Sequence, residues 1–168
     1  MKYAYGFGLT AAFAAPASAA AIDMTVTIPK LNVAEYHRPY VAIWLERTGT
    51  PNITNLSIWY DSDMKNNEGT KWLRDVRQWW RKTGRTLKHP VSGITGATRA
   101  PGPQKISFGP DRVGKLAPGN YELVVEAARE VGGRELLRMP FTWPVKGATT
   151  VRAGGEHELG AVVATIKP

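Results

Sequence analysis

The sequence predicts a mainly β fold, an immunoglobulin-like β-sandwich with one inserted amphipathic α-helix at about residues 70–83. Two observations lead to this prediction. Short segments in which apolar and polar residues alternate recur along the chain with turn residues between them, as in antiparallel sheets. Midway along the chain, apolar residues recur instead with the spacing of a helix that buries one face.

The alternating segments fall on both sides of that helix. Before it, strands are predicted at residues 22–28, 40–47 and 53–60, and the turn residues between the last two indicate a hairpin. In the third of these strands, the alternation puts Leu56, Ile58 and Tyr60 on one face. Gly132-Gly133 is a hairpin signal further on. After the helix, strands are predicted at residues 105–109, 121–127, 137–143, 149–152 and 158–166.

The predicted helix has an apolar face rich in tryptophan. Thr70 is its candidate N-cap and Gly84 its candidate C′ residue. The apolar face of this helix is too wide for every side chain on it to be buried. One of the paired Trp79 and Trp80 is therefore expected to be partly exposed. The residues on this face are Trp72, Leu73, Val76, Trp79 and Trp80.

Residues 1–19 have the pattern of a secretory signal peptide. Lys2 gives a positive start, an apolar segment follows, and Ala17-Ser18-Ala19 is a small-x-small cleavage site. Residues 20–168 are then expected to form a single periplasmic domain, and no later apolar run is long enough to span a membrane.

Composition narrows the classes of function. The chain has no cysteine, which excludes disulfides, cysteine-ligated iron–sulfur clusters, thiolate zinc sites and haem attachment motifs. Its net charge of +8 favours anionic partners such as phosphate groups or acidic lipid, while export argues against nucleic acid. No nucleophile elbow or phosphate-binding glycine loop is present, so hydrolytic catalysis has little support.

A stretch rich in small residues and hydroxyls follows the predicted helix. Within it, Thr95-Gly96-Ala97-Thr98 resembles the site that bacterial flavin transferases modify, in which the last threonine oxygen is joined to the phosphate of FMN. The resemblance implies that Thr98 is the acceptor. The small residues before it leave its hydroxyl accessible to a partner. Those targets usually carry an upstream acidic residue where this chain has Ser92. The alternative is a Gly/Thr-rich connection without chemistry.

Five stretches, one of which contains this motif, agree with one family pattern: residues 39–46, 56–60, 71–80, 95–102 and, together, 119–121 with 126–130. Taken together they resemble the bacterial predicted periplasmic proteins of domain of unknown function 2271, over nearly all of the mature chain. The resemblance implies a periplasmic, immunoglobulin-like domain. Such proteins tend to be encoded beside PepSY-type membrane reductases and flavin transferases, which are therefore the expected partners.

An FMN on Thr98 needs positive charge for its phosphate and an apolar surface for its ring. Arg99 is the adjacent cation, and guanidinium groups match phosphate geometry well. Trp79 and Trp80 are the candidate ring surface, and plain core packing is the commoner reason for tryptophans on such a helix face. Other candidates near in sequence are the cations Arg85, Lys88 and Lys105 and the aromatic residues Trp59 and Tyr60.

Metal binding is weakly indicated. No two of His37, His89 and His157 have the spacing of a ligand pair. Asp61-Ser62-Asp63 matches only the first ligands of a calcium loop, so an EF-hand is rejected. Glu156-His157-Glu158 is more typical of a solvent-facing strand start than of a metal site. No metal site is therefore predicted.

Three functions remain open. The leading hypothesis is a periplasmic electron carrier with covalent FMN, which accepts electrons from a membrane flavoreductase and passes them to a periplasmic acceptor or to iron, without being an enzyme itself. The second is a cofactor-free immunoglobulin-like binding module, which an exposed apolar patch around Trp79 or Trp80 would favour. The third is periplasmic metal or haem handling, which requires histidines or acids to converge in space.

Overall fold

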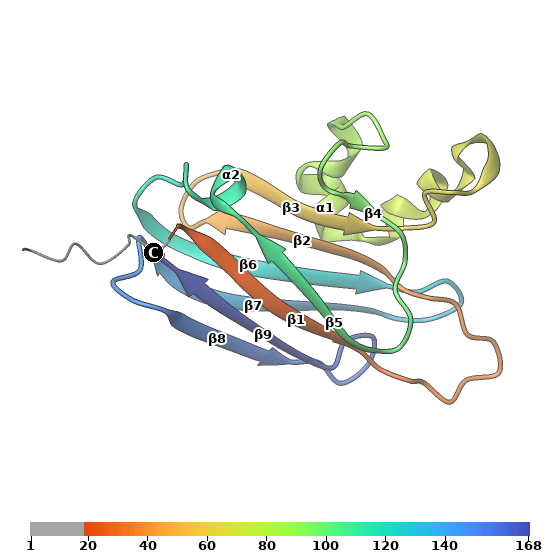
Figure 1. Ribbon diagram of the computed structural model, residues 1–168. Helices are drawn as coiled ribbons and strands as arrows, with labels where there is room; N and C mark the ends of the chain where they lie inside the picture. The colour runs from red at the N-terminus through yellow and green to blue at the C-terminus, as the bar shows by residue number, and fades with distance from the viewer. Residues whose placement is uncertain (1–18) are drawn as a thin grey trace, which may run out of the picture.

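The computed structural model describes residues 19–168, so the predicted signal peptide lies almost wholly outside the described residues. The described chain forms two sheets, one with strand order β5-β1-β9-β8 and the other with strand order β4-β3-β2-β6-β7 (Figure 1). The mainly β prediction is confirmed, and the immunoglobulin-like type of the sandwich stays a prediction. The strands are β1 (Ala21–Ile28), β2 (Tyr40–Arg47), β3 (Ile53–Trp59), β4 (Thr95–Gly96), β5 (Gly102–Phe108), β6 (Gly119–Ala128), β7 (Arg134–Trp143), β8 (Thr149–Gly154) and β9 (Ala161–Lys167).

Strand β2 of the five-stranded sheet is buried on both faces. Val41, Ile43 and Leu45 of β2 point into the main core, which the inward side chains of β1 and β9 complete from the opposite sheet. The alternate residues Ala42 and Trp44 lie in a second cluster beneath the helical segment, which Figure 1 shows over β2 and β3. Both faces of β2 are therefore apolar because each has a layer packed against it.

The predicted hairpin of β2 and β3 is confirmed. The prediction that Leu56, Ile58 and Tyr60 share one face of the strand is partly wrong. Ile43 pairs with Ser57 and Trp44 pairs with Asn55, so Leu56 is an extra residue at a bulge. A bulge breaks the two-residue alternation, and Leu56 consequently packs in the core between the sheets. Ile58 and Tyr60 lie in the other cluster, on the opposite face.

The predicted single helix at residues 70–83 is divided into two. A 3₁₀ helix, η1 (Lys65–Asp75), ends before Val76, whose φ of −77° and ψ of 69° are not helical, and α1 (Arg77–Lys82) follows. The predicted N-cap role of Thr70 is wrong, because its hydroxyl donates to the Asn67 carbonyl at 2.7 Å inside η1. The short segments η2 (Gly84–Thr86) and α2 (Pro110–Val113) complete the helical structure of the described residues.

The buried carboxylate of Glu126 explains where α1 begins. Its two oxygens accept the backbone N–H groups of Gln78 at 3.0 Å and Trp79 at 2.8 Å. Arg134 Nη1 donates to the same carboxylate at 2.8 Å. Helix N-termini leave N–H groups without partners, and here a side chain from β6 satisfies two of them. A strand residue distant in sequence thus determines the boundary.

The apolar face of the helical segment is buried largely as its spacing predicts. Val76 and Trp79 are fully buried, and Trp80 is partly exposed, which confirms the expected difference within the tryptophan pair. Gly84 follows the cap residue of α1 as predicted, and its role is packing, since a Cβ there would lie 2.4 Å from Cζ3 of Trp79. Within residues 19–168, no helix is both long and apolar enough to cross a membrane.

Candidate functional site

The segment before Thr98 is held on the edge of β3. The Ile58 N–H donates to the Ile94 carbonyl at 2.8 Å, and the Tyr60 N–H donates to the Gly96 carbonyl at 3.0 Å. The two strands run parallel, with Ile58 opposite Thr95 and Trp59 opposite Gly96. The stretch read from sequence as a loop therefore contains β4, a two-residue strand that positions the residues after it.

Thr98 meets a carboxylate two residues beyond this pairing. Its hydroxyl donates to Oδ1 of Asp61 at 2.9 Å, and the two residues are 37 apart in sequence. Sequence reasoning considered Asp61 only as part of a rejected calcium loop. Asp61, two residues after the end of β3, therefore places a carboxylate beside Thr98, although Ser92 stands where the resembled targets carry an acid.

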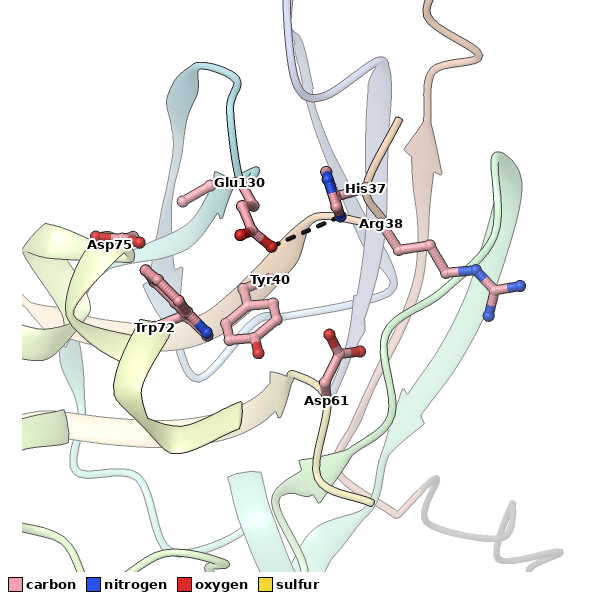
Figure 2. A pocket seen from close by; sticks show the side chains of 8 residues that line it. His37, Arg38, Tyr40, Asp61, Trp72, Asp75 and Glu130 are labelled. Atoms are coloured by element: carbon pink, nitrogen blue, oxygen red, sulfur yellow. Dashed lines mark ion pairs between the residues drawn. The ribbon is translucent and has the colours of Figure 1, made fainter. Parts of the chain in front are cut away.

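Asp61 lies in a hollow at the end of the five-stranded sheet (Figure 2). Tyr40 stands beside it, and burial together with the Asp61 charge raises the pKa of the Tyr40 hydroxyl to about 12. That hydroxyl donates to the Gly69 carbonyl at 3.1 Å. Other residues that line the hollow are His37, Arg38, Trp72, Asp75, Ala128 and Glu130.

Close packing holds the backbone of Asp61 in place. A Cβ on Gly69 would lie 2.0 Å from the Asp61 carbonyl oxygen, so only glycine allows η1 to approach this closely. The Met64 N–H also donates to that oxygen, at 3.4 Å. The carboxylate beside Thr98 is therefore placed by strand β3 on one side and by η1 on the other.

The other motif residues either contact neighbouring parts of the protein or are exposed to solvent. The Thr95 hydroxyl accepts the Val91 N–H at 2.9 Å and closes a turn. A Cβ on Gly96 would lie 3.3 Å from Cδ1 of Trp59, a tight contact. Ala97 is exposed and Thr98 is partly exposed. Of the two threonine hydroxyls, the one on Thr98 is therefore the accessible one.

Two guanidinium groups near the motif have no acidic partner. Arg99 lies over the Trp59 ring, with Cζ 4.9 Å from the ring centroid. Neither Arg99 nor Arg38 forms an ion pair within the described range 19–168. Arg38 was missed by sequence reasoning because its nearness to residues 100 and 101 depends on the fold.

The remaining candidate cations are spread over different elements. Arg85 lies on η2 and Lys88 follows it, and both are exposed. Lys105 is exposed on β5, where it pairs with Thr25. The structure does not gather these three into one cluster with Thr98.

The two tryptophans proposed as a ring surface are occupied by protein contacts. Trp79 has no exposed surface, and its indole N–H donates to Asn55 Oδ1 at 2.8 Å. Trp80 stacks on His89 with a centroid distance of 6.1 Å and an interplanar angle of 24°. Trp72, in contrast to Trp79 and Trp80, is an exposed side chain, with an exposed fraction of 39%.

The histidines lie in three separate environments. His37 Nδ1 is 3.6 Å from Glu130, drawn as the dashed line in Figure 2. His89 packs against the rings of Tyr60, Trp79 and Trp80. His157 donates its backbone N–H to Glu135 at 3.1 Å. No group of three His, Cys, Asp or Glu side chains in the described residues has the geometry of a metal site.

Chemically, the Thr98 region combines a nucleophile with a proton acceptor and unpaired cations. A hydroxyl that donates to a carboxylate is oriented for attack on an electrophile and can transfer its proton as the new bond forms. Guanidinium groups without an acidic partner are suited to phosphate oxygens. The arrangement therefore suits the attachment and retention of a phosphate group.

Comparison with known proteins agrees with the periplasmic location predicted from the sequence. No similar curated protein and no similar solved structure was found. A family model described as "Predicted periplasmic protein (DUF2271)" matches residues 21–161, from the first strand to the start of the last. Since the match covers most of the chain, the protein belongs to the DUF2271 family of predicted periplasmic proteins.

Proposed function

We propose that this periplasmic protein is an electron carrier that holds FMN by a phosphoester bond to Thr98. The observation that carries the proposal is the hydrogen bond from the Thr98 hydroxyl to Asp61, at 2.9 Å, within a motif that resembles flavin transferase targets. It supports the proposal because an acceptor hydroxyl needs a group that takes its proton. FMN, once attached, supplies one- and two-electron redox chemistry.

The attachment step balances with the residues present. Thr98 Oγ1 attacks the phosphorus of a flavin nucleotide donor that carries a nucleotide leaving group on the FMN phosphate. The Oγ1–P bond forms, the bond from phosphorus to the leaving group breaks, and the leaving group departs with its electron pair. The hydroxyl proton passes to Asp61, which is already its hydrogen-bond partner. The donor and its metal or electrostatic activation belong to the flavin transferase, one of the two proposed partners.

Local charge supports retention of the phosphate. Arg99 follows Thr98 directly, and Arg38 lines the hollow that contains Asp61. Neither is neutralised by an ion pair in residues 19–168, so both are available to a phosphodiester. The second proposed partner is a PepSY-type membrane reductase, which would reduce the flavin before it passes electrons to a periplasmic acceptor or to iron.

The test is the intact mass of the mature protein after co-expression with an active flavin transferase. We expect a mass increase equal to FMN less water, present in Ser92→Ala and absent in Thr98→Ala. Ser92 is an exposed hydroxyl in the same stretch, so its variant controls for general effects on the segment. An unmodified mass in cells where the transferase modifies another target would overturn the proposal.

A cofactor-free binding module is the second candidate, and one surface feature favours it. The exposed side chains Trp72 and Val131 line a shared hollow of about 350 Å³, bordered by Arg77 and Arg134. Exposed apolar residues beside charged ones are typical of protein contact sites. This candidate predicts an unmodified mass and a partner whose binding is lost in Trp72→Ala but kept in Thr98→Ala.

A further inference from the structure

We propose that the groove between the β1–β2 connection and the β4–β5 connection is the binding site for the flavin ring, an inference that rests on the proposed function. The groove is lined by Leu31, Tyr36, Ala100 and Pro101, with Lys30 and Arg38 at its edge. Both connections lie at the same end of the sandwich in Figure 1. The ligand is therefore an isoalloxazine ring tethered through its ribityl phosphate to Thr98.

The groove has the size and lining of a site for a fused aromatic ring. Its volume is about 430 Å³, within the range of small-molecule pockets. Leu31 and Pro101 provide apolar surface, and Tyr36 provides an aromatic ring. Arg129 lies over the Tyr36 ring, with Cζ 6.0 Å from its centroid.

The tether restricts the ring to nearby surfaces. Ala100 is two residues after Thr98, so their Cα atoms are at most about 7.2 Å apart. We infer that the ribityl chain and its phosphate bridge the remaining distance from Thr98 to the groove. The groove is therefore the apolar surface nearest to the acceptor along the chain.

Three of the aromatic residues that the sequence offered as a ring surface are already covered. Arg99 lies over Trp59, His89 stacks on Trp80, and Trp79 is fully buried. A ring on any of these would have to displace a protein contact. Tyr36, by contrast, lines an open groove.

Arg38 connects the groove to the acceptor. It lines both the hollow that contains Asp61 and the groove that contains Tyr36. Figure 2 shows its guanidinium extending away from Glu130. Positive charge beside a flavin stabilises the reduced, anionic ring, so Arg38 would raise the reduction potential. This charge suits a carrier that accepts electrons from a membrane reductase.

The experiment measures the environment of the flavin in protein that mass spectrometry has shown to be modified. A tyrosine in contact with the ring quenches flavin fluorescence by electron transfer, so Tyr36→Phe is expected to increase fluorescence several-fold. This variant is compatible with folding because the Tyr36 hydroxyl is buried without a hydrogen-bond partner in the described residues. Tyr121→Phe is the control, since Tyr121 pairs with Arg47 at the opposite end of β2.

A second readout does not depend on the tyrosine. Iodide is expected to quench the attached flavin several-fold less than free FMN, and Leu31→Glu is expected to restore most of that quenching. Arg38→Gln is expected to lower the reduction potential. A modified protein whose flavin is as accessible to iodide as free FMN, and unchanged in Tyr36→Phe, would overturn the ring site but leave the electron-carrier proposal intact. An absence of modification would overturn both.

Discussion

The Thr98 hydroxyl donates a hydrogen bond to Asp61, and the sequence separation of these two residues equals that of the paired residues in β3 and β4. Trp59 pairs with Gly96 at a separation of 96 − 59 = 37, and the Thr98–Asp61 hydrogen bond has the same separation of 37. In a parallel pair this separation is constant, so the contact continues the register of β3 and β4. A two-residue strand therefore aligns the candidate acceptor with its carboxylate.

The first prediction tests this alignment through Asp61→Asn. The amide oxygen still accepts the hydroxyl hydrogen bond, but it does not accept the proton. We expect the rate of flavin attachment by the transferase to fall by about a hundredfold, at the lower end of general-base effects. Mass spectrometry at successive times measures the rate.

Asp63→Asn is the matched control for this experiment. Asp63 is exposed, two residues from Asp61, and its contact is with the neighbouring Ser62 hydroxyl at 3.4 Å. We expect its rate to equal that of the wild type. If Asp61→Asn, with an unchanged melting temperature, were modified as fast as the wild type, Asp61 would have no role as proton acceptor.

The sequence predicted the parts of this protein that depend on local pattern. Alternation gave most strand positions, and the spacing of Val76 and Trp79 identified the buried face of the helical segment. The motif also pointed to Thr98 as the candidate acceptor, an assignment that stays a prediction. These features depend only on residues that are close in sequence, so the sequence alone predicts them.

Features that depend on distant pairing were missed for a physical reason. The bulge at Leu56 is visible only once β2 and β3 are aligned. The start of α1 depends on Glu126, which is 48 residues from Gln78 in the sequence. Asp61 and Arg38 approach the site only after β4 pairs with β3 and the β1–β2 connection folds back.

The second prediction concerns packing of the helical segment. Gly84→Ala puts a Cβ about where the Trp79 ring lies, at 2.4 Å from Cζ3, and Trp79 is fully buried and has no room to move. We expect the free energy of unfolding to fall by about 1–3 kcal/mol, as for other overpacked cores. Gly147→Ala is the control, because its Cβ would meet nothing within 4 Å. Urea unfolding measures both, and equal stabilities would contradict the packing argument.

The third prediction concerns acid stability. Burial acts to raise the pKa of Glu135, but backbone N–H groups of Glu156, Leu159, His157 and Glu158 outweigh it and lower that pKa below the ordinary 4.5. A depressed carboxylate pKa stabilises the fold above 4.5, and this contribution is lost as the pH falls through the folded-state value. Glu135→Gln is therefore expected to lose stability at neutral pH and to show a shallower decline between pH 5 and 3. Glu156→Gln, an exposed neighbour, is the control in urea titrations at each pH.

The fourth prediction concerns Glu126, whose carboxylate is fully buried. It accepts the N–H groups of Gln78 and Trp79 and forms an ion pair with Arg134 at 2.8 Å. Glu126→Ala leaves all three donors without this acceptor, so we expect a loss of about 3–5 kcal/mol, typical of breaking a buried pair. Arg134→Ala removes only the partly exposed member and keeps both backbone hydrogen bonds, so its loss is expected to be smaller.

Comparison of the two variants separates the helix contacts of Glu126 from its ion pair. Because Glu126 orients α1 and α1 carries Trp79, Glu126→Ala is also expected to loosen the tryptophan environment, which near-ultraviolet circular dichroism measures. The Arg134 variant is expected to keep the wild-type spectrum. If the two variants lost equal stability and both kept that spectrum, the backbone hydrogen bonds to Gln78 and Trp79 would contribute nothing, and the start of α1 would need another explanation.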